Sequence, residues 1–408
     1  MGAAAATTTT SLILLLLMFA VLAAGGRTKI SRELESNNNG DGLCKQIVET
    51  QGYSCEEHRV TTKDGYILSM QRIPTGRSGA TTKERPKPPV LLQHGILSDA
   101  TIWLDMPCDK ALGFILADNG FDVWLANVRA TAYSSRHTSL SFNDSEYWEW
   151  SWDELAAYDF PATVEHVYNQ TRQKLHYVGH SLGTLMAFAA FSRHKVFDMV
   201  RSAALLSPIA YMGQLPSPVS RIGAELFLGE AFYWLGIRKI APEEDRGPPS
   251  KLLVDICKQI NCSNLVDLTS LSSGPNCCMN SSRSHLNRQQ PTSTKNLIHL
   301  SQMIRNGNIA MYDYDTEEDN HKHYGQATPP EYDMTMIPTH IPLFLSYGGN
   351  DYQSDVNDVH TLIKTLSGHD PDKLVVQYVE SYAHLDFVYG ENAKQVVYDP
   401  VMAFFGSN

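Results

Sequence analysis

Positively charged residues are in deficit in this chain of 408 residues. Its 33 lysines and arginines stand against 44 aspartates and glutamates, which gives a formal net charge of −11. A chain with this balance lacks the basic excess needed to hold a polyphosphate backbone, so we expect no nucleic-acid partner. Charged residues are also few, at 19%, and internal repeats and heptads are absent, which excludes a disordered chain and a coiled coil.

Long hydrophobic runs are absent apart from residues 12–24. That run is too short for a membrane span, which takes about 20 apolar residues, and small residues follow it at 23–26. This arrangement is typical of a signal peptide, which we place at 1–26. Because residues 2–11 carry no lysine or arginine, a membrane anchor stays open as the alternative. We expect no stable transmembrane anchor and a secretory route that ends outside the cell or in a vacuolar or lysosomal lumen.

Cysteines with the spacing of a metal site are missing too. The chain has seven cysteines but no Cys-x-x-Cys and no Cys/His zinc pattern, so we expect neither a metal nor a cofactor. In an oxidising lumen, disulfides are the better interpretation. We predict a bridge between Cys44 and Cys55 and a free thiol at Cys108. Four further cysteines are expected to be oxidised with their pairing left open: Cys257, Cys262, Cys277 and Cys278.

Acceptor sequences for N-glycans fit the same route. The chain has four Asn-x-Ser/Thr patterns, beginning at Asn143, Asn169, Asn261 and Asn280. Such short patterns also arise by chance, so the prediction is that at least one of them carries a glycan.

Hydrophobic patterning predicts the fold class. After a flexible leader at 27–42, short runs rich in valine and leucine alternate with helical segments, at 90–93, 123–127, 175–179, 203–207, 343–347 and 375–379. Buried strands that alternate with helices predict an α/β fold with a mostly parallel sheet covered on both faces. A hairpin is predicted around Lys63-Asp64-Gly65.

This alternation stops between residues 213 and 338. The interrupted stretch has polar tracts and four of the seven cysteines, and no comparable series of strands. We interpret 213–338 as a mainly helical cap insertion, carried by a core that consists of residues 43–212 and 339–408.

The most informative local pattern is Gly179-His180-Ser181-Leu182-Gly183. It follows an expected strand and leads directly into an apolar helix, which is the context of a nucleophile elbow. Gly179 and Gly183 are expected because side chains there would collide with the neighbouring strand and helix. We predict that Ser181 is a nucleophile and that the Leu182 N–H faces a developing oxyanion. The alternative is an ordinary strand-to-helix turn.

A serine nucleophile needs a base and an acid, which follow it in the order acid and then histidine in this kind of site. Asp351 follows a buried strand that ends in Gly-Gly, and His384 follows the last expected strand. We therefore predict a Ser181–Asp351–His384 triad. Asp386 is the alternative acid, while Asp355 and Asp358 fit a solvated helix start.

Other histidines have weaker claims. His180 is adjacent to the serine on a tight turn, so it is expected to pack or to form a hydrogen bond. His321 and His323 could suggest a metal, but their polar setting favours a solvated loop. The second oxyanion donor should come from the loop after the first long strand, where Gly95 permits close approach. We choose the Ile96 N–H.

Taken together, the motifs resemble the acid lipase family, which comprises gastric and lysosomal acid lipases and their plant counterparts. The resemblance covers about residues 43–405 and rests on 93–96, 127–129, 147–154, 179–184, 348–351 and 384–387, with an amino-terminal lipase-associated segment at 57–74. It implies an α/β-hydrolase fold with a lid-bearing cap. It also implies a serine lipase acting on lipid esters through Ser181, Asp351 and His384.

One loop departs from the family pattern. Ala130 follows Arg129 where the pattern has glycine, and Ala132 stands where plant relatives often have a basic residue. Alanine tolerates a positive φ poorly, so this loop is predicted to be reshaped or strained.

Residues 219–240 carry an apolar stripe at near-helical spacing. Its members are Ile222, Leu226, Phe227, Leu228, Phe232, Tyr233, Trp234, Leu235 and Ile237. One interpretation is a buried cap helix. The other is a lid whose apolar face lines an acyl pocket or touches a lipid surface.

Two classes of function fit the sequence. The first is a secreted lipase or esterase, with triacylglycerol as the main expected substrate and sterol esters or small esters as alternatives. The second is a non-catalytic lipid carrier or receptor on the same scaffold, since a fold does not fix a function. A complete candidate triad with glycine flanks favours the enzyme.

Overall fold

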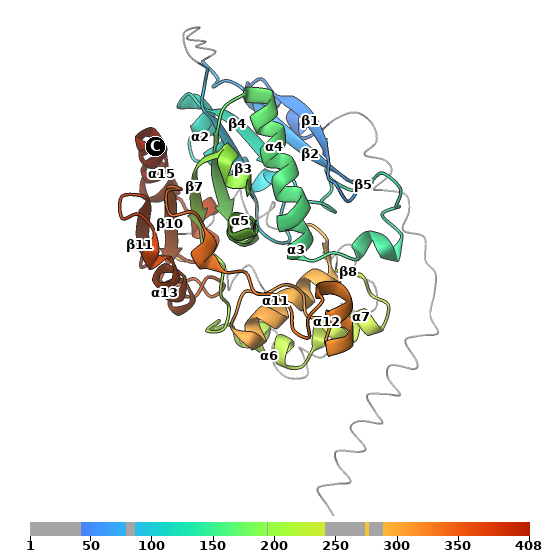
Figure 1. Ribbon diagram of the computed structural model, residues 1–408. Helices are drawn as coiled ribbons and strands as arrows, with labels where there is room; N and C mark the ends of the chain where they lie inside the picture. The colour runs from blue at the N-terminus through green and yellow to red at the C-terminus, as the bar shows by residue number, and fades with distance from the viewer. Residues whose placement is uncertain (1–41, 79–85, 194, 241–273, 277–288) are drawn as a thin grey trace, which may run out of the picture.

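A nine-stranded sheet forms the centre of the computed structural model, which describes residues 42–78, 86–193, 195–240, 274–276 and 289–408. Helices cover both faces of the sheet, and a smaller, mostly helical layer lies against one end of it (Figure 1). Residues 1–41, which include the predicted signal peptide and nearly all of the leader, lie outside the described residues.

The sheet runs in the order β1-β2-β4-β3-β6-β7-β10-β11, with β5 beside β2. The first two strands form the predicted antiparallel hairpin, and β2 is antiparallel to β4. The six neighbouring strands β4, β3, β6, β7, β10 and β11 are parallel to one another. All six predicted core strands are confirmed. The strands are β1 (Glu56–Thr61), β2 (Tyr66–Ile73), β3 (Pro89–Gln93), β4 (Asp122–Ala126), β5 (Arg136–His137), β6 (Leu175–His180), β7 (Val200–Leu206), β10 (Leu343–Gly348) and β11 (Leu374–Val379).

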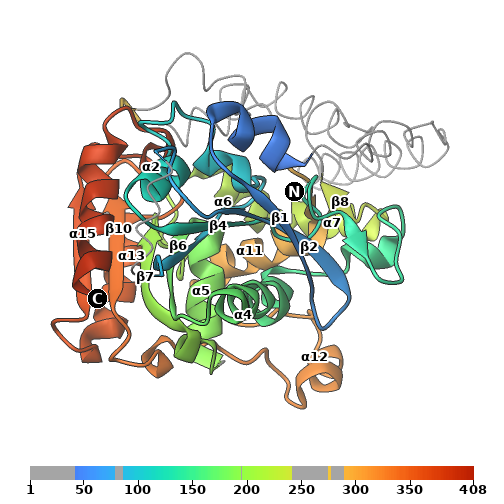
Figure 2. The same ribbon diagram turned by 90° about the horizontal axis from the view of Figure 1, so that it is seen from above.

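The two faces of the sheet make two hydrophobic clusters. Along β3, Leu91 packs into one cluster and Val90 and Leu92 pack into the other, because successive side chains of a strand point to opposite faces. The first cluster includes α4 (Phe160–Thr171), α5 (Leu182–Arg193) and α13 (Val356–Thr365); the second includes α2 (Leu112–Asp118) and α15 (Asp399–Ser407). Figure 2 shows α4 and α5 together on one side of the sheet. Burial on both faces explains why the core strands are continuously apolar.

Between β7 and β10 the described chain forms the smaller layer. It contains α6 (Pro218–Glu225), α7 (Leu228–Trp234), α11 (Thr294–Asn306) and α12 (Glu317–Tyr324), with a two-stranded ribbon of β8 (Lys239–Ile240) and β9 (Thr292–Ser293). These helices lie together below the sheet in Figure 1. Helix α11 packs on α6 and α7, and Arg305 of α11 bonds Glu230 of α7 at 2.6 Å.

The predicted apolar stripe at 222–237 is neither continuous nor buried. Phe227 has a left-handed backbone, with φ 53°, which separates α6 from α7. The side chains of Ile222, Leu226, Phe227 and Leu235 are 45–63% exposed, and Trp234 is 82% exposed. The interpretation as a buried cap helix is therefore wrong for these five side chains.

The predicted disulfide between Cys44 and Cys55 is confirmed, with its Cα atoms 5.3 Å apart, and Cys108 is free as predicted. The bridge fixes the first helical turn to the start of β1. Cys257, Cys262, Cys277 and Cys278 lie outside the described residues, as do the acceptor residues Asn261 and Asn280. Asn143 and Asn169 are exposed.

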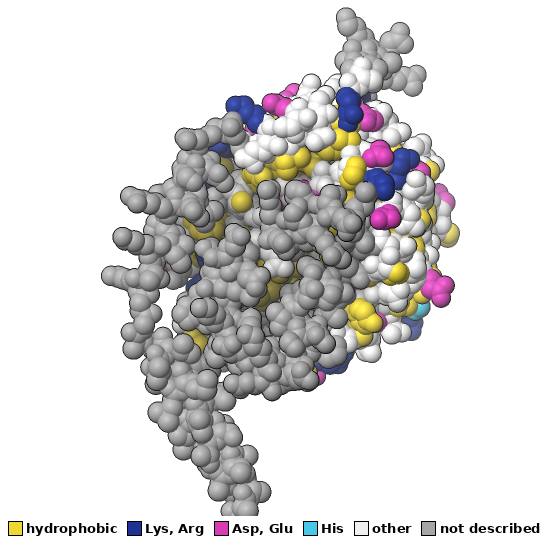
Figure 3. Space-filling view, turned by 180° about the vertical axis from the view of Figure 1, so that it is seen from behind, with side chains coloured by type: hydrophobic (Ala, Val, Ile, Leu, Met, Phe, Trp, Pro, Cys, Tyr) yellow, Lys and Arg dark blue, Asp and Glu magenta, His cyan; other side chains and the backbone are white. Residues whose placement is uncertain are grey.

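Neither a membrane-spanning helix nor, on the face in Figure 3, a separate basic surface is seen in the described part of the chain. Within the described ranges, no helix has both the length and the apolar character needed to cross a bilayer. On the described part of the face in Figure 3, basic and acidic side chains are intermixed rather than separated. This distribution agrees with the net acidity of the sequence.

Candidate active site

Ser181 lies on a strained turn at the end of β6. Its φ is 55°, in the left-handed region that costs energy in any residue with a side chain. The Ser181 N–H donates to Leu206 O at 3.1 Å, and the Ser181 carbonyl accepts from the Thr184 N–H at 2.8 Å. The turn is thus fixed by the neighbouring strand β7 and by the first turn of α5.

The two flanking glycines are needed for steric reasons, as predicted. A Cβ at Gly179 would lie 2.9 Å from the backbone of Gly183, and a Cβ at Gly183 would lie 2.7 Å from Gln93 O on the adjacent strand. Larger residues would push α5 away from the end of the sheet. The tight packing keeps the serine at the carboxyl edge of β6.

Asp351 and His384 lie in direct contact, as predicted. His384 Nδ1 is 3.0 and 2.9 Å from the two carboxylate oxygens of Asp351. Burial alone would raise the pKa of Asp351, but His384 and two backbone N–H groups hold that pKa below its usual range. Those N–H groups belong to Gln353 and Ser354, each 2.9 Å from Oδ1. The carboxylate is therefore an anion that fixes the imidazole with its proton on Nδ1.

The outer nitrogen of this histidine is available for chemistry. His384 Nε2 is buried and has no hydrogen-bond partner within the described chain, and no hydrogen bond joins it to the Ser181 hydroxyl. Ser181, Asp351 and His384 are each only 3% exposed. A ligand would therefore have to displace covering groups to reach them.

His180 and Asp386 support the histidine loop. His180 Nε2 lies 2.9 Å from His384 O, and burial lowers the pKa of His180 to about 3, so its neutral ring donates to that carbonyl. Asp386 accepts from the Ala383 N–H at 2.8 Å and from the Gly274 N–H at 3.3 Å. The aspartate that bonds to the His384 ring is thus Asp351, and the alternative acid serves the backbone.

The loop after β3 packs against the serine. A Cβ at Gly95 would lie 2.9 Å from Ser181 Cβ, so only glycine allows this approach. A cavity of about 10 Å³, room for about one water, lies beside it. Its lining includes Gly95, Ile96, Trp150, Leu182, Thr292 and Asn296. Both predicted oxyanion donors therefore belong to residues that line one cavity.

His94 orients this loop. The Val128 N–H donates to His94 Nε2 at 3.2 Å, so Nδ1 carries the proton and donates to Gly95 O at 2.7 Å. Burial lowers the pKa of His94, which keeps the ring neutral and this tautomer in place. His94 thus has a structural role, as a hydrogen-bonding residue that joins this loop to Val128.

The loop that departs from the family pattern is strained, as predicted. Ala130 has φ 68°, the region that favours glycine. Arg129 next to it is fully buried and bonds to Asp159 and Asp64, each at 2.6 Å. This buried ion-pair cluster holds the alanine in its unfavourable conformation.

Several weaker candidates have structural roles. Asp355 caps α13 through the Asn357 N–H, as expected for a helix start. Asp358 is buried rather than solvated, because its carboxylate accepts from the Gln214 N–H at 2.9 Å. His321 and His323 are exposed as expected, but they lie on helix α12 rather than in a loop. The centre of the His323 ring stacks 3.6 Å from that of Tyr314.

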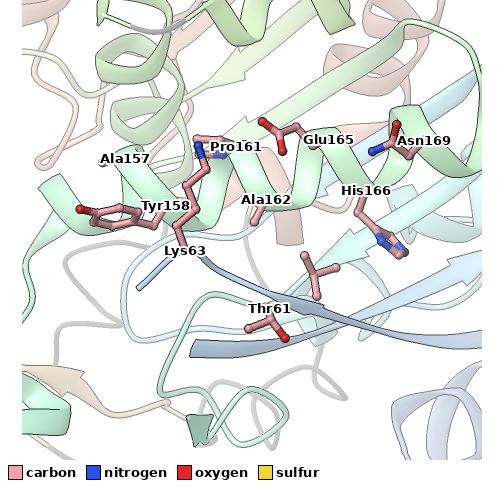
Figure 4. A pocket seen from close by; sticks show the side chains of 10 residues that line it. Thr61, Lys63, Ala157, Tyr158, Pro161, Ala162, Glu165, His166 and Asn169 are labelled. Atoms are coloured by element: carbon pink, nitrogen blue, oxygen red, sulfur yellow. The ribbon is translucent and has the colours of Figure 1, made fainter. Parts of the chain in front are cut away.

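A second and larger cavity lies elsewhere. It has a volume of about 200 Å³ and is a groove between β1 and α4, where His166 lies across from Thr61 (Figure 4). The groove is lined by no serine or cysteine and by none of the predicted triad, and the exposed Asn169 lies at its edge. The smaller cavity is not lined by a triad side chain either, but its lining includes Leu182, the residue next to Ser181, and Gly95, which packs against the serine. Its position rather than its size therefore connects it with the reactive serine.

Comparisons with known proteins agree with this geometry. Residues 44–106 match the family described as a partial alpha/beta-hydrolase lipase region, and residues 88–235 match the alpha/beta hydrolase fold. The chain is 48% identical to Triacylglycerol lipase 2 of Arabidopsis thaliana, over 89% of this chain and 87% of the relative. It is 32% identical to gastric triacylglycerol lipase of Rattus norvegicus, over 89% and 91%.

A solved structure supports the fold alone. A soluble variant of monoglyceride lipase from Saccharomyces cerevisiae aligns with a TM-score of 0.55 at 13% identity, over 88% of this chain and 97% of that one. The sheet order, the strained serine turn and the sequence relatives define an α/β-hydrolase of the lipase class. Within that class, the chain belongs to the acid lipase family.

Proposed function

We propose that this protein hydrolyses lipid esters, with triacylglycerol as the main substrate, through a Ser181–Asp351–His384 triad. The observation that carries the proposal is the pair of contacts at 2.9 and 3.0 Å between His384 Nδ1 and Asp351. The strained serine turn is tied to this pair through His180, which precedes Ser181 and bonds to His384 O. The names of the relatives, which include triacylglycerol lipases and a putative lysosomal acid lipase/cholesteryl ester hydrolase, favour this substrate class.

In the first half of the reaction, Ser181 Oγ attacks the ester carbonyl carbon while His384 Nε2 takes the hydroxyl proton. The carbonyl oxygen becomes an oxyanion, which accepts hydrogen bonds from the Ile96 and Leu182 N–H groups. Collapse of this intermediate breaks the ester C–O bond. The alcohol leaves with the proton from His384, and the acyl group stays on Ser181.

In the second half, water attacks the acyl-enzyme and gives its proton to His384 Nε2. A second oxyanion forms in the same place and collapses, which releases the fatty acid and returns the proton to Ser181 Oγ. Asp351 stays ionised throughout and stabilises the imidazolium that forms twice in each cycle. Atoms and charge balance without a metal or cofactor.

We infer that residues 213–338 act as a cap over this site. The cavity beside Ile96 and Leu182 has room for about one water, so an acyl chain needs displacement of cap residues such as Thr292. The exposed side chains of Ile222, Leu226, Phe227, Trp234 and Leu235 supply an apolar surface that a lipid–water interface would stabilise. The relatives named gastric and lysosomal lipases support a secretory route, to the exterior or to a vacuolar or lysosomal lumen.

The test of the proposed nucleophile is Ser181→Ala, with fluorophosphonate labelling and ester hydrolysis as readouts. We expect kcat to fall by about 10³- to 10⁶-fold and labelling to disappear, because only the attacking oxygen is removed. Ser202→Ala is the matched control, since Ser202 is also a buried serine on a parallel strand and its hydroxyl lies 2.7 Å from His176 Nδ1 rather than against the triad. Activity of Ser181→Ala within tenfold of wild type would refute the assignment. A wild type that never labels would favour the lipid carrier.

The interfacial role is tested by replacing Phe227 and Trp234 together with serine. Both side chains are exposed, so we expect little change in melting temperature and in hydrolysis of a short soluble ester. Hydrolysis of an emulsion should fall by about tenfold or more, because apolar surface that would be buried at the interface is lost. Equal losses on both substrates would contradict the interfacial role.

A further inference from the structure

The loop Gly95–Leu97, here called the oxyanion loop, contains a strained residue. Leu97 has φ 57°, a left-handed conformation that a leucine keeps only where surrounding contacts fix it. Its position one residue after Ile96 means that any relaxation of Leu97 would turn the neighbouring peptide groups. The contacts that fix Leu97 therefore bear on the predicted oxyanion donor.

Gln290 supplies two contacts around this loop. Its N–H donates to Leu97 O at 2.9 Å, and its side-chain Oε1 accepts from the Ala132 N–H at 2.9 Å. The Gln290 side chain is buried, at 8% exposure. The residue thus bonds both to the oxyanion loop and to the strained loop that contains Ala130.

The chain around Gln290 belongs to the smaller layer rather than to the sheet. Thr292 pairs with Ile240 in the β8–β9 ribbon, and the Thr294 N–H donates to Arg238 O at 2.9 Å. Ser293 Oγ also donates to Trp148 O. Gln290 is therefore held in place by its own segment and is able to hold the oxyanion loop in turn.

The direction of the Ile96 N–H follows from the peptide geometry. A trans peptide is planar, so the Ile96 N–H points opposite to Gly95 O, which His94 Nδ1–H fixes at 2.7 Å. On the other side of Ile96, Gln290 fixes Leu97 O. The core thus holds the carbonyl of the donor's own peptide group, and the cap holds the Leu97 carbonyl, two peptide groups further along the loop.

We propose that Gln290 is a positioning residue that couples the seating of the cap to the direction of the Ile96 N–H. This inference rests on the proposed function, because it assigns a purpose to the oxyanion loop of that same site. When the cap segment at 289–293 is displaced, the oxyanion loop loses one of its two restraints. The value of kcat then depends on whether the cap segment contacts the oxyanion loop, and not only on whether a substrate can reach the serine.

The Gln290 N–H that holds Leu97 O survives any change of the side chain, so the experiment removes the side-chain bond to Ala132 that anchors this backbone. It compares Gln290→Met, which keeps the length of the side chain but removes the strong acceptor, with Gln290→Glu, which keeps the acceptor. Gln289→Met is the matched control, because Gln289 is the half-buried neighbour on the same segment. Each variant is assayed for kcat and KM on a short-chain p-nitrophenyl ester and for amide hydrogen exchange of the peptide that contains residues 95–98. Fluorophosphonate labelling of wild-type Ser181 is measured in parallel.

Gln290→Met should lower kcat by about tenfold with KM within about twofold, a smaller loss than the roughly 10²- to 10³-fold for removal of a whole oxyanion donor. Exchange in 95–98 should become faster, Gln290→Glu should recover most of kcat, and Gln289→Met should match wild type. Unchanged kcat and exchange in Gln290→Met would overturn the inference, as would equal losses in the Met and Glu variants. If wild type is neither labelled nor active, the proposed function itself has failed.

Discussion

Two buried aspartates, Asp351 and Asp153, each lie near a histidine, yet their pKa values shift in opposite directions. The Asp351 carboxylate accepts a hydrogen bond from His384 Nδ1 at 2.9 Å, and the pKa of Asp351 is lowered despite its burial. The Asp153 carboxylate is 4.0 Å from the His299 ring, and burial raises its pKa to about 6. Proximity to a histidine does not by itself lower the pKa of a buried carboxylate; here the lowered pKa goes with a direct hydrogen bond from the imidazole ring.

The partners of Asp153 explain its different role. It accepts from the Tyr332 hydroxyl at 2.6 Å and from the Tyr312 N–H at 2.8 Å, so it joins α3 (Trp152–Glu154) to the segment after α11. Burial lowers the pKa of His299 to about 3, and this neutral ring donates through Nε2 to Ala310 O at 2.8 Å. The hydrogen bonds of Asp153 connect the core to the cap, whereas the Asp351–His384 pair is arranged for proton transfer.

The sharpest way to break this comparison is to make the same substitution at both aspartates. Asp351→Asn should lower kcat by about 10⁴-fold, because the amide holds the imidazole in the wrong tautomer. Asp153→Asn should leave kcat within about threefold, since no proton transfer passes through it. Steady-state kinetics on one soluble ester would check both. A larger loss in Asp386→Asn than in Asp351→Asn would show that the acid has been misassigned.

The same two variants should differ in how stability depends on pH. The folded pKa of Asp153 is about 6 against 3.8 when unfolded, so its contribution to stability is fully present below about 3.8 and is lost as pH rises through 6. At about 1.4 kcal/mol per pKa unit, the loss is about 3 kcal/mol. Asp351, with a lowered pKa, contributes stability above its unfolded pKa that is lost as pH falls.

Urea unfolding from about pH 2 to 8 would measure these contributions, because the Asp351 window lies below 3.8 and the Asp153 window lies between 3.8 and about 6. Relative to wild type, Asp153→Asn should remove part of the stability loss at higher pH, and Asp351→Asn should remove part of the loss at low pH. The slope with pH is the quantity to compare, because asparagine also loses an acceptor and lowers the absolute stability of both variants. The quantity is the free energy of unfolding of each variant minus that of wild type, plotted against pH. Slopes of the same sign for the two variants would contradict the assigned pKa shifts.

What the sequence predicted follows from how local each signal is. The valine- and leucine-rich runs identified the core strands, and the glycine pattern around Ser181 identified its turn, because the cause of each lies within a few residues. Asp351 and His384 were found for the same reason, since each directly follows a strand. The exposure of Trp234 was not predictable, because a stripe of apolar residues carries no information about what packs on it.

Contacts between residues far apart in the sequence were the main features that the sequence did not predict. The Asp153 cluster joins residues 153, 312 and 332, and the bond from His180 to His384 O spans 204 positions. The burial of Asp358 likewise depends on Gln214, 144 positions away. No periodicity or motif around any one of these residues reports a partner at that separation, so the supporting contacts of the site appeared only in three dimensions.

The smallest effect we expect concerns His180, which links the serine turn to the histidine loop. Its neutral ring donates to His384 O at 2.9 Å, and the Ser207 hydroxyl donates to the same carbonyl at 3.4 Å. His180→Phe keeps the ring packing against His384 but removes the donor. It should lower kcat by about fivefold, because the lost hydrogen bond that positions the base is worth about 1 kcal/mol. Since burial holds the pKa of His180 near 3, the loss should be constant from pH 5 to 8. A loss that appears only below pH 6.5 would mean that His180 titrates in the active protein and acts through its charge instead.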